Sequence, residues 1–367
     1  AFPGFLLSDD TEMTISGPAG TGKTFLVRYL TEMAPAQQRM VKLLDPKIAD
    51  RSFTYTATTN KAAEVLRGIL NCKTSTIHST LGLRVKNDYT SGKQILVPHA
   101  PPEPLKHTVI FVDEASMINE QLGGAIRSAI KEFTDCKLVF IGDKYQLPPV
   151  KEDICHVFRD GAPNVHHLTE IHRQVKDSPI IHLATKYREL LDNPSDQWPE
   201  IVPDGKTIFR YHDKGPYFDA LRREYSTPHA ADDLRIVAWS NTRVQNYNNW
   251  IRTKVLGHTS RYEPGDLVTT NKPLLSRSMY SPTDFRLTID EATRGTDHIE
   301  DIAVEGWWIS FREYPGDPGK QAPVVFQPED WTRVKAIQKA FAKDKNWGPY
   351  FRIKDNWADL RAIHANT

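Results

Sequence analysis

The segment Gly17–Thr24, with sequence GPAGTGKT, constrains the fold of this chain more than any other. It fits the pattern G-x-x-x-x-G-K-[ST], in which the backbone N–H groups of a glycine-rich loop surround phosphate oxygens. Such a loop needs a strand before it and a helix after it. Thr11–Ser16 has the pattern of a short strand, and Phe25–Met33 has that of a helix. The sequence therefore predicts a strand–loop–helix unit that binds a nucleotide.

The loop residues have separate expected roles. Lys23 is expected to reach the β- and γ-phosphates of ATP, and the Thr24 hydroxyl is expected to bind Mg²⁺. A glycine-rich turn without a ligand is the alternative, but such a turn does not need lysine and threonine at the start of the following helix. ATP and Mg²⁺ are thus the expected cofactors. The expected nucleotide-binding residues of the loop are Gly17, Pro18, Ala19, Gly20, Thr21, Gly22, Lys23 and Thr24.

Length and composition indicate a globular protein of two to four domains. The chain has 367 residues, of which 39% are hydrophobic and 25% charged. Apolar runs stay short of the roughly 20 residues that span a bilayer, and the first residues lack a signal-peptide pattern, so we expect a cytoplasmic protein that does not bind membranes. Three scattered cysteines fit a reducing compartment. With a net charge of +1, nucleic-acid binding would have to depend on local clusters of lysine and arginine.

The first half of the chain alternates predicted strands and helices. Three apolar runs have strand length, and two segments between them have helical character. Runs that are apolar throughout are typical of a parallel sheet covered on both faces, so the predicted fold class is α/β. The strands are expected at Phe53–Thr58, Thr108–Val112 and Lys137–Ile141, and the helices at Lys61–Leu70 and Gln121–Phe133.

Two interruptions divide the rest of the chain. Arg84–Pro104 carries a turn signal between two β-like stretches and predicts an inserted β-hairpin. After Asp177 the α/β pattern restarts, and from Glu263 onward proline, glycine and tryptophan indicate a β-rich insertion followed by helices. The predicted domains are residues 1–176 with the 84–104 hairpin, an incomplete second α/β domain at 177–262, the β-rich insertion at 263–362, and a return to the second domain at 363–367.

Acidic and amide side chains follow two of the predicted buried strands. Asp113 and Glu114 come directly after TVIFV, where Asp113 is expected to bind Mg²⁺ and Glu114 to deprotonate the attacking water. Alone, such a pair is most often a strand-end cap, but the preceding phosphate-binding loop favours the catalytic interpretation. Gln146 lies in the loop after KLVFI and is a candidate for contact with a γ-phosphate, although a loop merely stiffened by proline is the alternative.

Six motifs, in order, give the chain a family resemblance. It resembles superfamily 1B DNA helicases of the RecD-like group, most closely the phage Dda-type members, over most of residues 11–250. The matching segments after the phosphate-binding loop are Thr56–Ala63, Ser75–His78, Asp113–Met117, Gly142–Val150, Leu168–Gln174 and Ala238–Thr242.

The resemblance implies two RecA-like domains that hydrolyse ATP, move 5′→3′ along single-stranded DNA and open duplex DNA. It implies that Arg173 is an arginine finger and that the hairpin is a strand-separating pin, for which Tyr89 is the aromatic candidate. It also implies a monomer that acts at junctions of single- and double-stranded DNA, with replication or recombination proteins such as a single-strand-binding protein. The implied DNA-contacting residues are Thr58, Thr59, Asn60, His78, Trp239 and Asn241.

Several of these residues could instead have a purely structural role. Arg173 could form a surface ion pair, His78 could be a structural histidine, and Tyr89 could be a turn residue. For the whole chain, the alternatives are a P-loop ATPase that remodels nucleic acid or protein without unwinding, and a DNA-binding remnant without turnover. Since the family's motifs V and VI would begin near His364–Thr367 and beyond, the resemblance implies that residues 1–367 alone hydrolyse ATP slowly and do not unwind duplex DNA.

Overall fold

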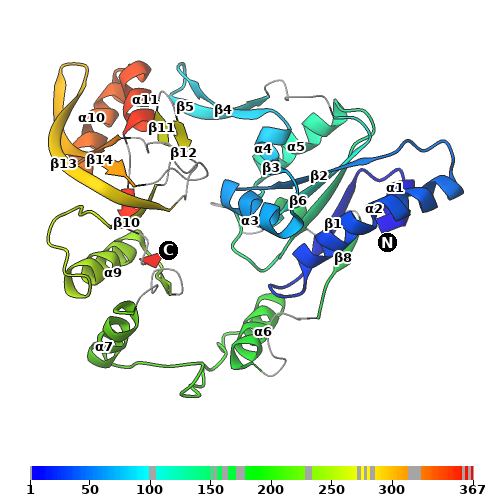
Figure 1. The fold of residues 1–367 in the computed structure, drawn as a ribbon, viewed down its shortest axis with the longest axis horizontal. Helices are drawn as coiled ribbons and strands as arrows, with labels where there is room; N and C mark the ends of the chain where they lie inside the picture. Colours follow the sequence, from blue (N-terminus) through cyan, green and yellow to red (C-terminus); the bar gives the residue numbers. More distant parts are fainter. Residues whose placement is uncertain are drawn as a thin grey trace. The chain divides into compact units, whose positions relative to one another are not determined.

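In a computed structural model, the chain folds into two compact units (Figure 1). The first unit comprises Ala1–Lys86 and Ile95–Arg210, and the second comprises Asn87–Gln94 and Tyr211–Thr367. The residues that the structure describes are 2–98, 105–149, 152, 155–158, 164–170, 178–227, 234–270, 274–276, 279–281, 286–312, 324–357, 360–362 and 365–366.

A six-stranded parallel sheet is the centre of the first unit, which confirms the predicted α/β class. Its strand order is β3-β2-β6-β7-β1-β8. The central strands β6 and β7 are buried almost throughout, as their apolar sequences predict. The strands are β1 (Glu12–Ser16), β2 (Ser52–Ala57), β3 (Thr74–Thr76), β6 (Thr108–Asp113), β7 (Lys137–Gly142) and β8 (Val165–His167).

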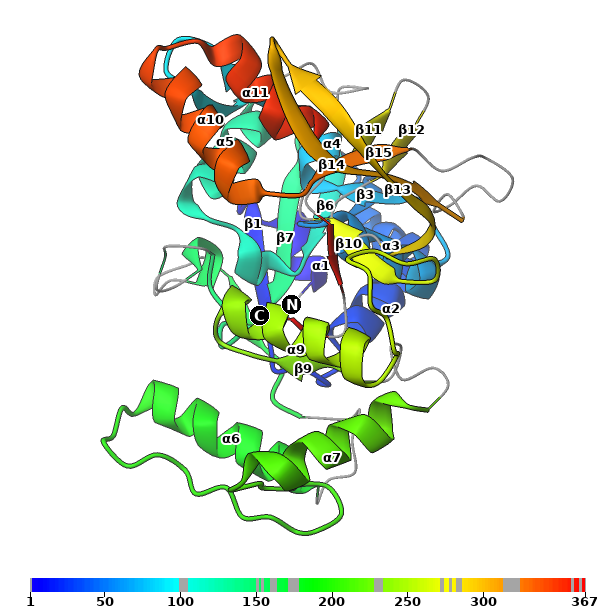
Figure 2. The ribbon, with the colours of Figure 1, turned by 90° about the vertical axis from the view of Figure 1, so that its left-hand side faces the viewer.

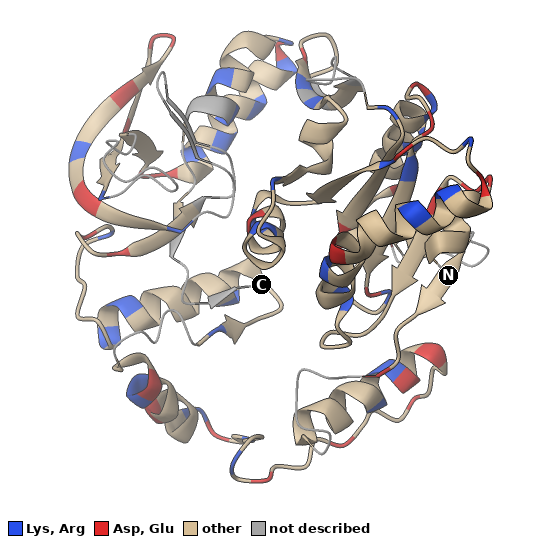
Figure 3. Cartoon of the chain, turned by 45° about the vertical axis from the view of Figure 1, so that its right-hand side comes forward, with Lys and Arg blue, Asp and Glu red and all other residues tan. Residues whose placement is uncertain are grey.

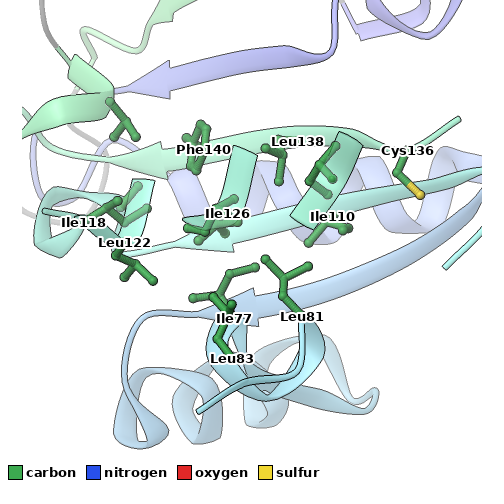
Figure 4. Packing of buried hydrophobic residues seen from close by; sticks show 14 of the residues in the cluster. Ile77, Leu81, Leu83, Ile110, Ile118, Leu122, Ile126, Cys136, Leu138 and Phe140 are labelled. Carbon is green, nitrogen blue, oxygen red and sulfur yellow. The ribbon is translucent and has the colours of Figure 1, made fainter. Parts of the chain in front are cut away.

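Helices cover both faces of this sheet. Because strand side chains alternate between faces, Val109 and Phe111 of β6 pack in one core cluster, while Ile110 and Val112 pack in the other. Figure 4 shows the second cluster, gathered between the sheet and the helices α4 and α5. One face carries α1 (Phe2–Leu7), α2 (Lys23–Leu44) and α3 (Asn60–Leu70), and the other carries α4 (Ile77–Thr80), α5 (Glu120–Lys131) and the short turns η1 (Ala115–Met117) and η2 (His156–Phe158).

The inserted hairpin is present as predicted. Its antiparallel strands are β4 (Leu83–Asp88) and β5 (Lys93–Pro98), and residues 99–104 of the predicted insertion lie outside the described part of the chain. The hairpin tip belongs to the second unit, where the Tyr89 ring packs edge-on against Phe351, with centroids 5.1 Å apart.

The boundary between the compact units falls after Arg210, whereas the sequence predicts a domain boundary after residue 176. The helix α6 (Pro179–Asp192), predicted as part of the second domain, packs with the first unit. Hydrogen bonds from Lys144 and Tyr145 to Asp192, the last residue of α6, connect it to the loop after β7. The helical period of α6 is visible in the sequence, but these partners are not.

A five-stranded antiparallel sheet is the largest element of the second unit, with order β15-β14-β13-β10-β16. The helices α10 and α11 lie against the long β13–β14 hairpin, where Val334 and Ile353 join one core cluster (Figure 2). The strands are β10 (Leu267–Thr270), β13 (Leu287–Ile299), β14 (Ile302–Phe311), β15 (Val325–Pro328) and β16 (Leu360–Ala362), and the helices are α10 (Trp331–Lys343) and α11 (Trp347–Asn356).

The remaining elements of this unit include a parallel pair of strands. β9 pairs in parallel with β17, and the helix α9 follows β9 directly. A small antiparallel pair, β11 with β12, lies in the β-rich segment. These elements are α7 (Lys214–Tyr225), β9 (Ile236–Val237), α9 (Asn241–Lys254), β11 (Leu274–Ser276), β12 (Met279–Ser281) and β17 (Ala365–Asn366).

A buried ion pair joins α9 to the β-rich segment of the second unit. The Arg252 guanidinium donates to both carboxylate oxygens of Asp266, and the His258 ring lies 2.7 Å from the same carboxylate. Asp266 and Arg252 are 3% and 8% exposed. Although burial acts to raise it, hydrogen bonds from Arg252 and from the Glu263 N–H hold the pKa of Asp266 below its ordinary value.

Replacing Asp266 by asparagine is expected to destabilise the second unit by about 3 kcal/mol, because it leaves a buried guanidinium without a counter-charge. Every tryptophan except Trp198 lies in this unit, so tryptophan fluorescence during urea unfolding reports its stability. Because folding lowers the pKa of this carboxyl, its contribution is complete above about pH 4 and is lost as the pH falls through the folded-state pKa. The exposed Asp301→Asn is the control; equal stability of the two variants would contradict the prediction.

Candidate nucleotide-binding site

The glycine-rich loop joins the carboxyl end of β1 to the amino end of α2. Gly20 and Gly22 have φ angles of 85° and 81°, which glycine adopts without steric cost. A Cβ atom at Gly17 would lie 2.7 Å from the Thr21 hydroxyl and 2.8 Å from the Leu168 carbonyl oxygen, so a larger residue does not fit. Since α2 begins without a side-chain cap, the N–H groups of its first turn remain available to an anion.

Lys23 is the first residue of α2, and Thr24 follows it. The Lys23 Nζ donates hydrogen bonds to the carbonyl oxygens of Gly17 (2.7 Å) and Pro18 (3.0 Å). Burial lowers the pKa of Lys23, and three nearby carboxylates oppose this shift. They belong, in order of their effect, to Asp143, Glu114 and Asp113. The loop lysine therefore lies among the acidic residues that end the neighbouring strands.

Asp113 is the last residue of β6, and its carboxylate accepts a hydrogen bond from the Glu114 N–H at 2.9 Å. Burial raises the pKa of Asp113. Burial also raises the pKa of Glu114, and the neighbouring charge of Asp113 adds to that increase. The carboxylate oxygens of Asp113 and Glu114 and the hydroxyl of Thr24 are hard oxygen donors of the kind that Mg²⁺ prefers. These oxygen donors thus fit Mg²⁺. The glycine-rich loop, with its lysine and the uncapped start of α2, fits a chain of phosphates.

The backbone of Glu114 is held in an unusual conformation. Its φ angle is 53°, in the left-handed region that residues other than glycine seldom adopt. The Thr58 hydroxyl, just beyond β2, donates to the Glu114 carbonyl oxygen at 3.3 Å. Strained backbone that the surroundings hold in place is concentrated at functional sites.

Asp143 is a site residue that the sequence reasoning missed. It follows β7, is 2% exposed, and its carboxylate accepts a hydrogen bond from the Tyr145 N–H at 3.0 Å. Its signal was available, because it is the first residue after a strand with an apolar interior in a parallel sheet. Gln146, which was predicted, has an exposed side chain three residues further along the same loop.

The predicted DNA-contacting residues of the first unit lie after β2 and β3, at the same sheet edge as the phosphate-binding loop. Thr59 caps α3, because its hydroxyl oxygen accepts a hydrogen bond from the Ala62 N–H. Asn60 is exposed at the start of that helix. His78 is half-buried on α4, and burial lowers its pKa. These residues therefore lie at the same carboxyl edge of the sheet as the nucleotide site.

Other predicted residues lie elsewhere. Trp239 is fully exposed after β9, and Asn241 begins α9. Both belong to the second unit, as does Tyr89. Arg173 lies outside the described residues. Basic and acidic residues are interspersed along the elements of each unit (Figure 3). Among the described helices, none has both the length and the apolar character that a membrane span requires.

Comparison with known proteins identifies related sequences. A family model described as "AAA domain" matches residues 1–190. The ATP-dependent DNA helicase dda of Enterobacteria phage T4 is 27% identical over 275 residues, which cover 71% of this chain and 56% of that protein. The ATP-dependent RecD2 DNA helicase of Deinococcus radiodurans is 28% identical over 201 residues, which cover 53% of this chain and 24% of that protein.

Among solved structures, the Pif1 helicase from Candida albicans aligns with 100% of this chain and 83% of its own, at 16% identity and a TM-score of 0.41. The chain spans only about half the length of the phage relative and a quarter of RecD2. The AAA-domain match covers more than half of the chain and contains the whole nucleotide-binding edge described above. The chain belongs to the AAA-domain family, and its similarity to the phage dda and RecD2 proteins agrees with the resemblance of its motifs to superfamily 1B helicases of the RecD-like group.

Proposed function

We propose that this protein is an ATP-dependent DNA helicase that moves 5′→3′ along single-stranded DNA and unwinds duplex DNA. The observation that supports this most is the edge of the six-stranded sheet, where Lys23, Asp113 and Glu114 lie together in a chain whose relatives include DNA helicases. A motor that moves along DNA needs its ATP-hydrolysing residues close to the elements that contact the DNA strand.

The residues of the site have distinct roles in this proposal. Lys23 binds the β- and γ-phosphates, and Thr24 and Asp113 hold Mg²⁺. Mg²⁺ held there would neutralise charge on the phosphates during hydrolysis. Glu114 takes the proton of the attacking water, and Gln146 orients the terminal phosphate. Arg173 supplies a further positive charge as an arginine finger.

DNA binding follows from the elements beside this site. Thr58, Thr59, Asn60 and His78 contact the sugar–phosphate backbone at the ends of β2 and β3, and Trp239 and Asn241 contact it from the second unit. Backbone contacts position the strand without selecting a sequence. The β4–β5 hairpin divides the strands at the junction, with Tyr89 at its tip. The protein acts as a monomer in the cytoplasm, alongside replication or recombination proteins such as a single-strand-binding protein.

Strand displacement tests this proposal. The natural full-length protein is incubated with Mg–ATP and a duplex that carries either a 5′ or a 3′ single-stranded tail. Release of the labelled strand from the 5′-tailed substrate alone is the expected result. Release from the 3′-tailed substrate would contradict the polarity, and ATP hydrolysis without release from either would favour an ATPase that remodels nucleic acid without unwinding.

DNA affinity is expected to depend on salt and hardly on sequence. Several phosphate contacts should lower the affinity for single-stranded DNA on the order of tenfold between about 50 and 200 mM salt, through counterion release. Fluorescence anisotropy with labelled oligonucleotides of two unrelated sequences measures both properties. A flat salt response, or affinities that differ strongly between the two sequences, would show that backbone contacts do not dominate.

A further inference from the structure

One face of α6 is complementary in charge to the loop after β7. Arg188 and Asp192 lie four residues apart, so they share one face of the helix. The Arg188 guanidinium lies 3.7 Å from the Asp143 carboxylate. Asp192 lies 3.2 Å from the Lys144 ammonium and also accepts a hydrogen bond from the Tyr145 hydroxyl. Three consecutive loop residues are thus held by two residues of one helix.

The Arg188 contact differs from the other two in its burial. Asp143 is 2% exposed and the Arg188 side chain 21%, whereas Lys144 and Asp192 are well exposed. Ion pairs at exposed positions contribute little, but a buried carboxylate without a partner is costly. Of the three contacts, the Arg188–Asp143 pair is therefore expected to contribute most to holding the loop after β7.

Asp143 is also the carboxylate that acts most strongly on the phosphate-binding lysine. Its charge opposes the lowering of the Lys23 pKa more than those of Glu114 and Asp113 do, and the Arg188 charge acts in the opposite direction. The Gly142 carbonyl oxygen, one residue before Asp143, accepts a hydrogen bond from the Gly17 N–H of the phosphate-binding loop at 3.0 Å, so phosphates held by this loop would come close to Asp143. Because like charges repel strongly where water is scarce, an uncompensated Asp143 would disfavour the terminal phosphate.

We propose that Arg188 is a positioning residue for ATP binding, which holds the loop after β7 and neutralises Asp143 so that the terminal phosphate can approach Lys23. This rests on the proposed nucleotide site. In this arrangement the Arg188–Asp143 ion pair connects α6 to the nucleotide-binding edge of the sheet, and ATP binding depends on that pair. A protein that keeps Asp143 but lacks the Arg188 charge is expected to bind ATP more weakly than a protein that lacks both charges.

A charge-removal cycle tests this inference through binding alone. Fluorescent N-methylanthraniloyl derivatives of ATP and ADP are titrated, with Mg²⁺, into the natural full-length protein. We expect Arg188→Gln to raise the Kd for the ATP derivative about tenfold, within the range of coupled charge networks, and the Kd for the ADP derivative about twofold or less. Arg188→Lys keeps the charge and should recover most of the loss. Lys186→Gln, an exposed cation on the same helix, is the matched control and should leave both Kd values unchanged.

The double variant separates charge compensation from a structural role. In an Asp143→Asn background, Arg188→Gln should change the Kd for the ATP derivative by less than about threefold, since no charge remains to be neutralised. A loss of tenfold in that background, or equal losses for ATP and ADP, would overturn the inference, as would an unchanged Kd for Arg188→Gln. If Arg188→Gln alone fails to fold, the test still rests on the Kd values of Asp143→Asn and of the double variant Asp143→Asn with Arg188→Gln. Lys23→Ala binding as tightly as the parent would instead refute the nucleotide site itself.

Discussion

Replacing Lys23 by alanine is expected to abolish Mg–ATP hydrolysis, with a loss of at least about 10³-fold. Its Nζ is the cation that the loop itself provides to the β- and γ-phosphates, and its present hydrogen bonds to Gly17 and Pro18 are made to the loop alone. Steady-state release of phosphate in the natural full-length protein measures the effect. The fold should remain, because the described hydrogen bonds of this side chain go to carbonyl oxygens of its own loop.

Lys42→Ala is the matched control for this variant. Lys42 lies on the same helix and forms an exposed ion pair with Asp50, 2.7 Å away, so its loss should leave hydrolysis unchanged. Circular dichroism tests whether both variants are folded. Hydrolysis by Lys23→Ala at the parent rate would show that the glycine-rich loop is not the nucleotide site.

Glu114→Gln is expected to retain ATP and DNA binding while turnover falls about 10²–10⁴-fold. Glutamine keeps the shape of the side chain but cannot accept the proton of the attacking water. The conformation of residue 114 should persist, because Thr58 bonds to its carbonyl oxygen rather than to its side chain. Quenched-flow measurement of the first turnover, together with nucleotide titration, separates lost chemistry from lost binding.

The exposed Glu64→Gln on α3 serves as the control for Glu114→Gln and should hydrolyse ATP normally. A normal turnover number for Glu114→Gln would remove Glu114 from the reaction. Weakened nucleotide binding with an unchanged first-turnover rate would assign it to ground-state binding instead.

The first unit could be predicted from sequence because its signals are local. The strands β6 and β7 have apolar interiors, VIFV and LVFI, and the glycines of the phosphate-binding loop mark the positions with positive φ at Gly20 and Gly22. Because the carboxyl ends of parallel strands meet at one edge of a sheet, predicting a parallel sheet was enough to predict that Asp113 and Glu114 lie near Lys23. Local pattern and topology together therefore located the nucleotide site.

Features that depend on distant partners could not be predicted in this way. β13 (Leu287–Ile299) has few apolar residues, so its strand character comes from its pairing with β14 rather than from its own pattern. Asp143 and Arg188 belong to separate elements, and only folding brings their charges together. The position of α6 in the first unit depends on the same contacts, which explains why the predicted boundary at residue 176 differs from the observed division after Arg210.

The central claim is that single-stranded DNA drives ATP hydrolysis at the Lys23–Glu114 site. The most direct test is the ATPase rate of the natural full-length protein with and without a single-stranded oligonucleotide, beside its Glu114→Gln variant. The account predicts a rate that rises at least about tenfold with DNA in the parent and stays at background in the variant. Hydrolysis that DNA does not accelerate, or that survives in Glu114→Gln, would contradict it.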